Sequence, residues 1–163
     1  MRVARRMAVS FSPKQYEGGL DASGLKIAVV CARWNPTVTD AMLAAALDTL
    51  RRRGARDRDV SVARVPGAFE VAAGARALLD ARKPHALVAL AAIVRGETTH
   101  HEVLGHAVGA ALANLSVDSG VPIGFGILTC DTMEQARRRS DKGVEAAEAA
   151  IEMANLRRSL KGR

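Results

Sequence analysis

The sequence predicts a three-layer α/β/α fold built on a four-stranded parallel sheet. From Gly24 onward, short runs of β-branched and apolar residues alternate with longer stretches of helical periodicity, which is typical of β-α-β units. One short run, residues 85–94, is apolar almost throughout, as expected of a central strand that helices cover on both faces. A chain of 163 residues has room for roughly one such core.

Four strands are expected, at residues 25–31, 60–65, 85–94 and 122–128. We expect them in the flavodoxin-like order 2-1-3-4, in which ligands bind beyond the carboxyl ends of the strands. Residues 1–23 show neither helical nor strand periodicity, so we interpret them as an N-terminal arm. Residues 24–163 then form a single α/β domain.

The predicted helices begin at recognisable capping patterns. Asn35-Pro36 supplies an N-cap and a proline at the first helical position, and Gly54 ends that helix. The second helix is expected over 67–81. The third is expected over 99–115, with a capping box formed by Thr99 and Glu102.

The last helical region opens on a second box-like pattern, Asp131-x-x-Glu134. It ends on an apolar stripe that runs to Ala154.

The chain is basic, with a formal net charge of +7, but its charge pattern does not favour a nucleic-acid partner. The basic residues fall in separate clusters at 51–53, 137–139 and 157–163, and no aromatic residues are interleaved with them for base stacking. We interpret the clusters as solvated helix faces and a basic tail, and expect no nucleic-acid partner.

The two cysteines, Cys31 and Cys130, lie in or beside apolar runs, which favours free buried thiols over a disulfide scaffold. No signal-peptide core and no run of ~20 apolar residues is present, so we expect a cytoplasmic protein without membrane contact.

Two motifs are weaker than they first look. The segment from His101 to His106 resembles a zinc-binding H-E-x-x-H helix, but the second histidine comes one residue late and Gly105 stands at the ligand position. We expect no metal. Gly124-Phe125-Gly126 lacks the third glycine of a dinucleotide fingerprint and falls inside a strand.

Residues 95–100, Arg-Gly-Glu-Thr-Thr-His, join the central strand to a helix N-terminus. Exposed main-chain N–H groups make such a turn an anion site, and Gly96 lets a phosphate approach the backbone. A histidine beside a bound phosphate is placed for proton transfer near neutral pH. The alternative is that Thr99 and Glu102 only cap the helix, with the histidines facing water.

Two of the five aromatic residues follow strand ends. Trp34 follows the first strand and Phe69 follows the second, so together they could form a flat apolar slot for a ring. Asn35 and Glu70 would then supply edge hydrogen bonds. The alternative is that both aromatics belong to the core.

Six segments stand in order along the chain between Gly24 and the last helix. They are Arg33-Trp34-Asn35, Val65-Pro66-Gly67-Ala68-Phe69-Glu70, Arg95-Gly96-Glu97-Thr98-Thr99-His100, Phe125-Gly126-Ile127-Leu128-Thr129, Glu134-Gln135-Ala136 and Lys142-Gly143. Taken together, they resemble the 6,7-dimethyl-8-ribityllumazine synthase family. Each is modest alone, but their joint spacing is highly specific.

The resemblance implies a condensation of 5-amino-6-(D-ribitylamino)uracil with 3,4-dihydroxy-2-butanone 4-phosphate, which releases phosphate and water and needs no cofactor or metal. It implies that His100 transfers protons and that sites lie between the chains of a homo-oligomer. The substrate-binding residues it implies are Trp34, Asn35, Ala68, Phe69, Glu70, Ala92, Ile93, Val94, Glu97, Thr98, Arg139, Lys142 and, from a neighbouring subunit, Phe125. His101, turned about 100° from His100 along the helix, is given no catalytic role.

The sequence departs from the family pattern at two places. Trp34 stands where most members have Phe, which keeps a stacking surface but enlarges it. Only Ser140 and Asp141 separate Arg139 from Lys142, whereas capsid-forming members carry several more residues there. The short connection leaves the choice between Arg138 and Arg139 open and predicts a pentamer or decamer without an icosahedral shell.

Three rival functions remain open from sequence. A riboflavin synthase of the same fold would join two lumazine molecules. A ribityl-ligand binding or assembly protein would have lost catalysis. A nucleic-acid module would bind with salt-dependent affinity.

Overall fold

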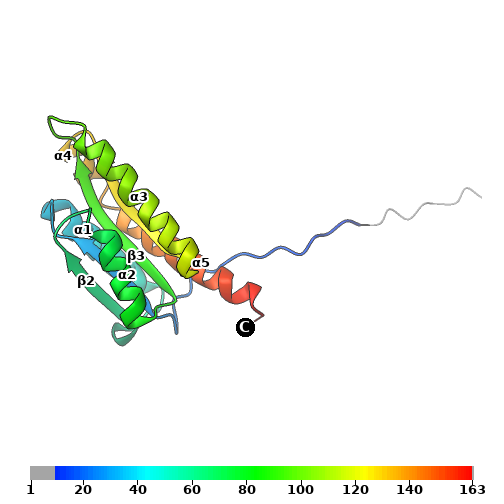
Figure 1. The fold of residues 1–163 in the computed structure, drawn as a ribbon. Helices are drawn as coiled ribbons and strands as arrows, with labels where there is room; N and C mark the ends of the chain where they lie inside the picture. The colour runs from blue at the N-terminus through cyan, green and yellow to red at the C-terminus, as the bar shows by residue number, and fades with distance from the viewer. Residues whose placement is uncertain (1–9, 163) are drawn as a thin grey trace, which may run out of the picture.

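The computed structural model describes residues 10–162, and Figure 1 shows one parallel sheet with helices on both faces. The strands are β1 (Ile27–Ala32), β2 (Val60–Val65), β3 (Ala86–Val94) and β4 (Ile123–Cys130), in the order β2-β1-β3-β4. All three pairings are parallel. The predicted fold class and strand order are therefore confirmed.

The helices divide between the two faces of the sheet. They are α1 (Pro36–Arg52), α2 (Val71–Arg82), α3 (His100–Ser119), α4 (Met133–Arg138) and α5 (Lys142–Leu160), with a short 3-10 turn at Asp57–Asp59. α1, α4 and α5 pack on one face, and α2 and α3 on the other. Each face has its own apolar cluster.

β3 is the central strand that its composition predicts, with every residue buried from Ala86 to Ile93. The edge strands β2 and β4 instead include exposed and half-buried residues. Because helices cover both faces of β3, almost none of its side chains faces solvent, and the strand can be apolar along its whole length.

Gly124 and Gly126 lie inside β4, as predicted, and they permit close packing. A Cβ atom at Gly124 would come within 1.9 Å of the Ala146 carbonyl oxygen of α5, and one at Gly126 within 2.5 Å of Leu90 Cδ2. Gly124 therefore lets α5 lie directly against β4, and Gly126 leaves room for the Leu90 side chain of β3.

Some helix boundaries differ from the prediction. α2 begins at Val71 instead of residue 67, because residues 66–70 form a turn in which the Glu70 carboxylate accepts a hydrogen bond from the Gly67 N–H at 2.9 Å. α3 continues to Ser119, where Gly120 takes a left-handed conformation.

The last helical region is two helices, and its cap lies one residue later than expected. Thr132, not Asp131, caps α4 by accepting from the Gln135 N–H at 3.1 Å, while the Gln135 side chain accepts from the Asp131 N–H at 2.9 Å. Residues 139–141 then connect α4 to α5.

Residues 10–23 form no helix or strand, and Figure 1 shows the first part of this segment running away from the sheet. Its last residues are tied to the body, because the Asn155 side chain donates to the carbonyls of Gly19 and Asp21 at 2.7 and 2.8 Å. No helix among the described residues is long and apolar enough to cross a lipid bilayer.

Candidate active site

The loops that follow the four strands lie side by side at the carboxyl edge of the sheet. Main-chain hydrogen bonds extend the strand pairing into these loops: the Arg33 N–H donates to the Val65 carbonyl at 2.8 Å, and the Arg95 N–H donates to the Cys130 carbonyl at 2.8 Å. The parallel sheet therefore brings segments that are distant in sequence to one edge.

A cleft of about 450 Å³ opens at this edge, and we call it the strand-end cleft. Trp34 and Phe69 are 73% and 71% exposed, so neither is a core residue. The cleft is within the size range of small-molecule sites. Its lining residues are Trp34, Asn35, Gly67, Ala68, Phe69, Glu70, Ala92, Ile93, Val94, Gly96, Thr98, His100, His101 and Leu104.

Asn35 joins the start of α1 to the end of β3. Its backbone is left-handed, with a φ of 58°, and its side chain does not cap α1 as expected. The Nδ2 group donates instead to the Ala92 carbonyl at 2.7 Å. The Oδ1 atom of the same amide makes no hydrogen bond within residues 10–162 and can accept one from a ligand.

The side chains of Ala92 and Ile93 are apolar and buried, so the only polar groups that these residues offer the cleft are those of the main chain. Glu70 also lines the cleft and is held by its bond from the Gly67 N–H. The cleft thus combines apolar ring surfaces with a few fixed polar groups, the composition typical of ligand sites.

Residues 95–99 form the loop between β3 and α3. Within residues 10–162 the main-chain N–H groups of Gly96, Glu97 and Thr98 donate to no protein group. Thr99 is the N-cap of α3, but its side chain makes none of the predicted capping bonds; the Thr98 hydroxyl accepts from the His100 N–H at 3.4 Å. Free donors at a helix N-terminus are suited to an anion.

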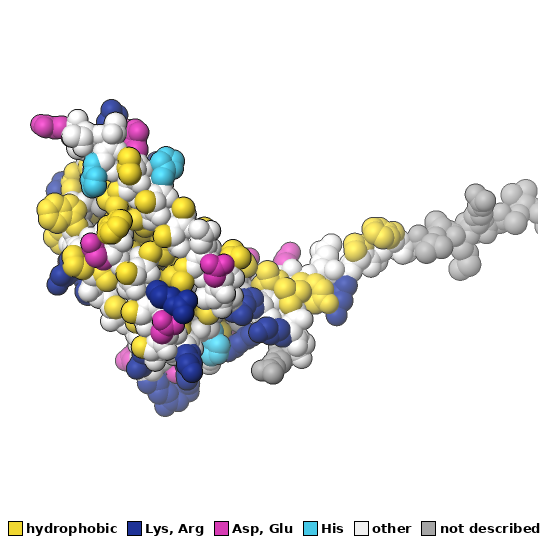
Figure 2. Space-filling view, viewed as in Figure 1, with side chains coloured by type: hydrophobic (Ala, Val, Ile, Leu, Met, Phe, Trp, Pro, Cys, Tyr) yellow, Lys and Arg dark blue, Asp and Glu magenta, His cyan; other side chains and the backbone are white. Residues whose placement is uncertain are grey.

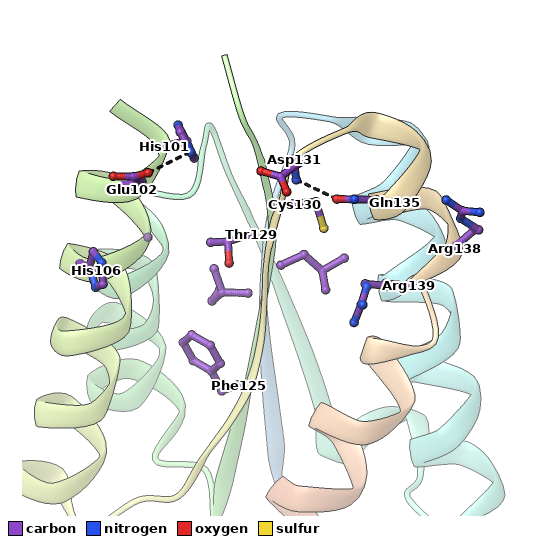
Figure 3. Close-up of a pocket in the computed structure, with 13 residues that line it drawn as sticks. His101, Glu102, His106, Phe125, Thr129, Cys130, Asp131, Gln135, Arg138 and Arg139 are labelled. Carbon is purple, nitrogen blue, oxygen red and sulfur yellow. Dashed lines mark hydrogen bonds and ion pairs between the residues drawn. The ribbon is translucent and has the colours of Figure 1, made fainter. Parts of the chain in front are cut away.

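A second and larger cleft, of about 1160 Å³, lies along the edge strand, and we call it the β4 cleft. Figure 3 shows Phe125 and Thr129 on the strand, between α3 on one side and Arg139 on the other. Phe125 is 46% exposed. This cleft and the strand-end cleft lie on the same chain but share only His101 among their lining residues.

Arg138 and Arg139 both line the β4 cleft but differ in their surroundings. Arg138 pairs with Glu134 at 3.6 Å, and Figure 3 shows it turned away from β4. Arg139 points toward the strand. Burial raises the pKa of the Cys130 thiol, and the positive charge of Arg139 partly opposes that rise. Arg139 is therefore the arginine closer to the strand end.

Two predicted substrate-binding residues lie outside both clefts. The Lys142 ammonium pairs with Glu145 on the same helix at 2.6 Å, and Glu97 lies exposed in the loop before α3. A role for Glu97 therefore rests on its main-chain N–H.

His101 is the residue that sequence reasoning set aside and the structure places at the site, since it lines both clefts. Its 100° rotation from His100 does not take it out of the site, because two cleft walls meet at the first turn of α3. Thr129 and Gln135, which carry part of the family resemblance, also line the β4 cleft.

Both cysteines are free and buried. Burial raises the pKa of Cys31 to about 11, so its thiol stays protonated at neutral pH. Within residues 10–162 no cluster of three His, Cys, Asp or Glu side chains is arranged to hold a metal ion. Gly105 of the zinc-like motif faces Thr129 on β4, where a Cβ would come within 2.9 Å of Thr129 Cγ2.

Comparison with known proteins agrees with the resemblance. The family model described as 6,7-dimethyl-8-ribityllumazine synthase matches residues 24–158. A protein of that name from Thermotoga neapolitana is 45% identical over 153 residues, which cover 91% of this chain and 92% of the relative. One from Thermotoga petrophila is 44% identical, with 91% and 93% covered. The chain therefore belongs to the 6,7-dimethyl-8-ribityllumazine synthase family.

Proposed function

We propose that this chain is a transferase that condenses 5-amino-6-(D-ribitylamino)uracil with 3,4-dihydroxy-2-butanone 4-phosphate, forming 6,7-dimethyl-8-ribityllumazine and releasing phosphate and water. Family membership supports the reaction and does not favour a riboflavin synthase. The observation that carries the proposal is that Trp34 and Phe69, from two different loops, and His100, the first residue of α3, line one cleft.

The strand-end cleft would hold the pyrimidine substrate. Trp34 would stack on the ring, and Phe69 with Ala68 and Glu70 would hold the ribityl side. The Asn35 Oδ1 atom and the main chain of residues 92–94 would meet the polar edge of the ring.

The loop before α3 would hold the phosphate of the second substrate. The free N–H groups of Glu97 and Thr98 are donors at the positive end of a helix of 20 residues. Arg139 would add a positive charge from a neighbouring copy, because on its own chain it lines the β4 cleft instead.

The chemistry requires several proton movements. The 5-amino group attacks the ketone and water leaves to give an imine; phosphate is then eliminated, and the second amine closes the ring with loss of water. His100, on the cleft wall, would carry protons between these groups, as an imidazole does near neutral pH. Holding both substrates in register would supply much of the remaining rate.

The same proposal requires a homo-oligomer, and we propose a pentamer or a decamer. Phe125 and Trp34 line different clefts on one chain, so a site containing both needs two copies. The exposed apolar side chains of Trp34, Phe69, Val103 and Phe125 support burial against neighbours. The connection between α4 and α5 is shorter than in capsid-forming members of the family, and this does not favour an icosahedral shell.

We further propose a cytoplasmic location, which the two free thiols support. Residues 1–23, of which 1–9 lie outside the described residues, would act as an arm on a single domain of residues 24–163, of which residue 163 also lies outside them. We propose no nucleic-acid partner.

The deciding experiment mixes the purified protein with both substrates and follows lumazine absorbance and phosphate release together. We expect both signals in equal amounts. Riboflavin formed from lumazine alone would instead identify a riboflavin synthase, and ligand binding without turnover would identify a binding protein. Light scattering that gives a 60-subunit particle would contradict the proposed oligomer.

A further inference from the structure

His101 occupies the first turn of α3, where the walls of the strand-end cleft and the β4 cleft meet. Its side chain is only 14% exposed, although the residues around it at the helix start are largely exposed. Figure 3 shows it at the top of α3 beside Glu102. Because this imidazole is mostly buried, the protein groups close to its two nitrogens can be named.

The Nδ1 atom of His101 lies 3.1 Å from the carbonyl oxygen of Thr98. A carbonyl can only accept a hydrogen bond, so Nδ1 carries a proton and donates it. The Nε2 atom lies 3.8 Å from the Glu102 carboxylate, which is too far for a hydrogen bond but close enough for attraction to a protonated ring.

Thr98 is thereby held at two points by the start of α3. Its carbonyl accepts from the His101 ring, and its hydroxyl accepts from the His100 N–H at 3.4 Å. The two bonds fix the end of a loop whose N–H groups at 96, 97 and 98 have no partner within the described chain. A loop without internal main-chain bonds depends on such side-chain ties for a single conformation.

We propose that His101 is a positioning residue, whose Nδ1–H donation to the Thr98 carbonyl holds loop 95–99 in the shape that receives the phosphate of the ketone substrate. The inference rests on the proposed function. It assigns His101 no contact with the reacting atoms. Its effect is therefore on the binding of the phosphorylated substrate and not on the ring substrate or the chemical step.

Two variants separate the hydrogen bond from the shape of the side chain. His101→Phe keeps a planar ring but removes both nitrogens. His101→Asn places an amide NH₂ where Nδ1 stands and restores a donor to Thr98. Removing one hydrogen bond of this kind changes a binding constant by up to about tenfold.

We expect His101→Phe to raise KM for the phosphorylated ketone by about tenfold, with KM for the pyrimidine and kcat each within about twofold of wild type. His101→Asn is expected to stay within about threefold for all three values. Equal increases in both KM values, no change in either, or equal losses in the two variants would each overturn the proposal. The thermal unfolding midpoint of both variants checks that the fold is kept.

Binding of inorganic phosphate, followed by ³¹P line broadening, tests the same loop without turnover. We expect wild type and His101→Asn to bind phosphate alike and His101→Phe to bind it about tenfold more weakly. If the three proteins bound phosphate as expected but wild type formed no lumazine, the proposed function would fail while the role of His101 stood. Equal phosphate binding by all three proteins would refute the role of His101.

Discussion

The Asn35 side chain donates a hydrogen bond to the Ala92 carbonyl across 2.7 Å, and so ties the start of α1 to the end of the central strand. Asn35 also has a left-handed backbone, with a φ of 58°. Asparagine tolerates this conformation better than other residues with a Cβ. One residue thus meets two requirements at the wall of the strand-end cleft.

Substitutions at Asn35 separate these two requirements. Asn35→Gly keeps the left-handed backbone and loses the hydrogen bond, which is worth about 1 kcal/mol. Asn35→Ala loses the bond and adds about 1 kcal/mol of backbone strain. We expect the free energy of unfolding, measured in urea, to fall in the order wild type, Gly variant, Ala variant. An Ala variant as stable as the Gly variant would show that the backbone strain is absent.

His100→Ala tests the proposed proton transfer. We expect kcat to fall by roughly ten- to a hundredfold. This is at or below the low end of the rate factor that a positioned acid or base contributes, about 10²- to 10⁴-fold, because the orientation of the two substrates remains. KM values are expected to change little, since the phosphate donors are main-chain groups. A variant with full kcat would remove His100 from the mechanism. His85→Asn serves as the control, because His85 precedes β3 at the other end of the sheet and lines neither cleft.

The central strand was predictable because burial on both faces leaves a direct record in the sequence, and the edge strands were predictable as short β-branched and apolar runs between helical segments. β2 was predicted with its observed bounds, and β3 within one residue. The place of the segments that carry Trp34, Phe69 and His100 was also predictable, because a parallel sheet brings the connections after its strands to its carboxyl end.

The local interactions were harder to predict, because competing patterns overlap. Asp131-x-x-Glu134 and Thr132-x-x-Gln135 are both acceptable capping boxes one residue apart, and only the structure shows that Thr132 is the cap. Asn35 has a capping residue's identity but a partner 57 positions away. Neither choice is encoded by local spacing.

The break between α4 and α5 also has a tertiary cause. No proline or glycine precedes it, but Gly143 at the start of α5 sits where a Cβ would come within 2.1 Å of the Met42 carbonyl oxygen of α1. The direction of α5 is therefore set by its contact with α1, which sequence periodicity does not record.

Gly124→Ala tests the close approach of α5 to the sheet. The added Cβ would meet the Ala146 carbonyl oxygen at 1.9 Å, and a backbone atom cannot move aside as a flexible side chain can. We expect a loss of about 3 kcal/mol in the free energy of unfolding, the upper range for overpacking. Gly19→Ala is the matched control, because nothing lies within 4 Å of its Cβ and its φ is not positive. A Gly124→Ala variant with the same free energy of unfolding as wild type would contradict the close packing of α5 on β4.

His85 gives the protein a pH-dependent stability at the end of the sheet opposite the clefts. Basic side chains gather at this lower end in Figure 2. Burial lowers the pKa of His85, and the positive charges of Arg158, Lys26 and Arg157 lower it further. The ring also accepts a hydrogen bond from the Lys26 N–H at Nδ1, at 2.8 Å, which favours the neutral form.

The sign of the effect follows from proton linkage. In the unfolded chain His85 regains its ordinary pKa of about 6.5, so below that pH the unfolded chain binds a proton that the folded protein resists. The free energy of unfolding should therefore fall as the pH drops below about 6.5 and should gain nothing from this group above it. Added salt should weaken the part of the effect due to the exposed cations.

His85→Asn isolates this contribution, because the amide oxygen can still accept from the Lys26 N–H but does not titrate. We expect urea unfolding at pH values of about 5.5 and about 7.5 to show a smaller difference in the variant than in wild type. The variant should also be relatively more stable at the lower pH. If wild type and variant lose the same stability between the two pH values, the positive surroundings of His85 do not act on its protonation.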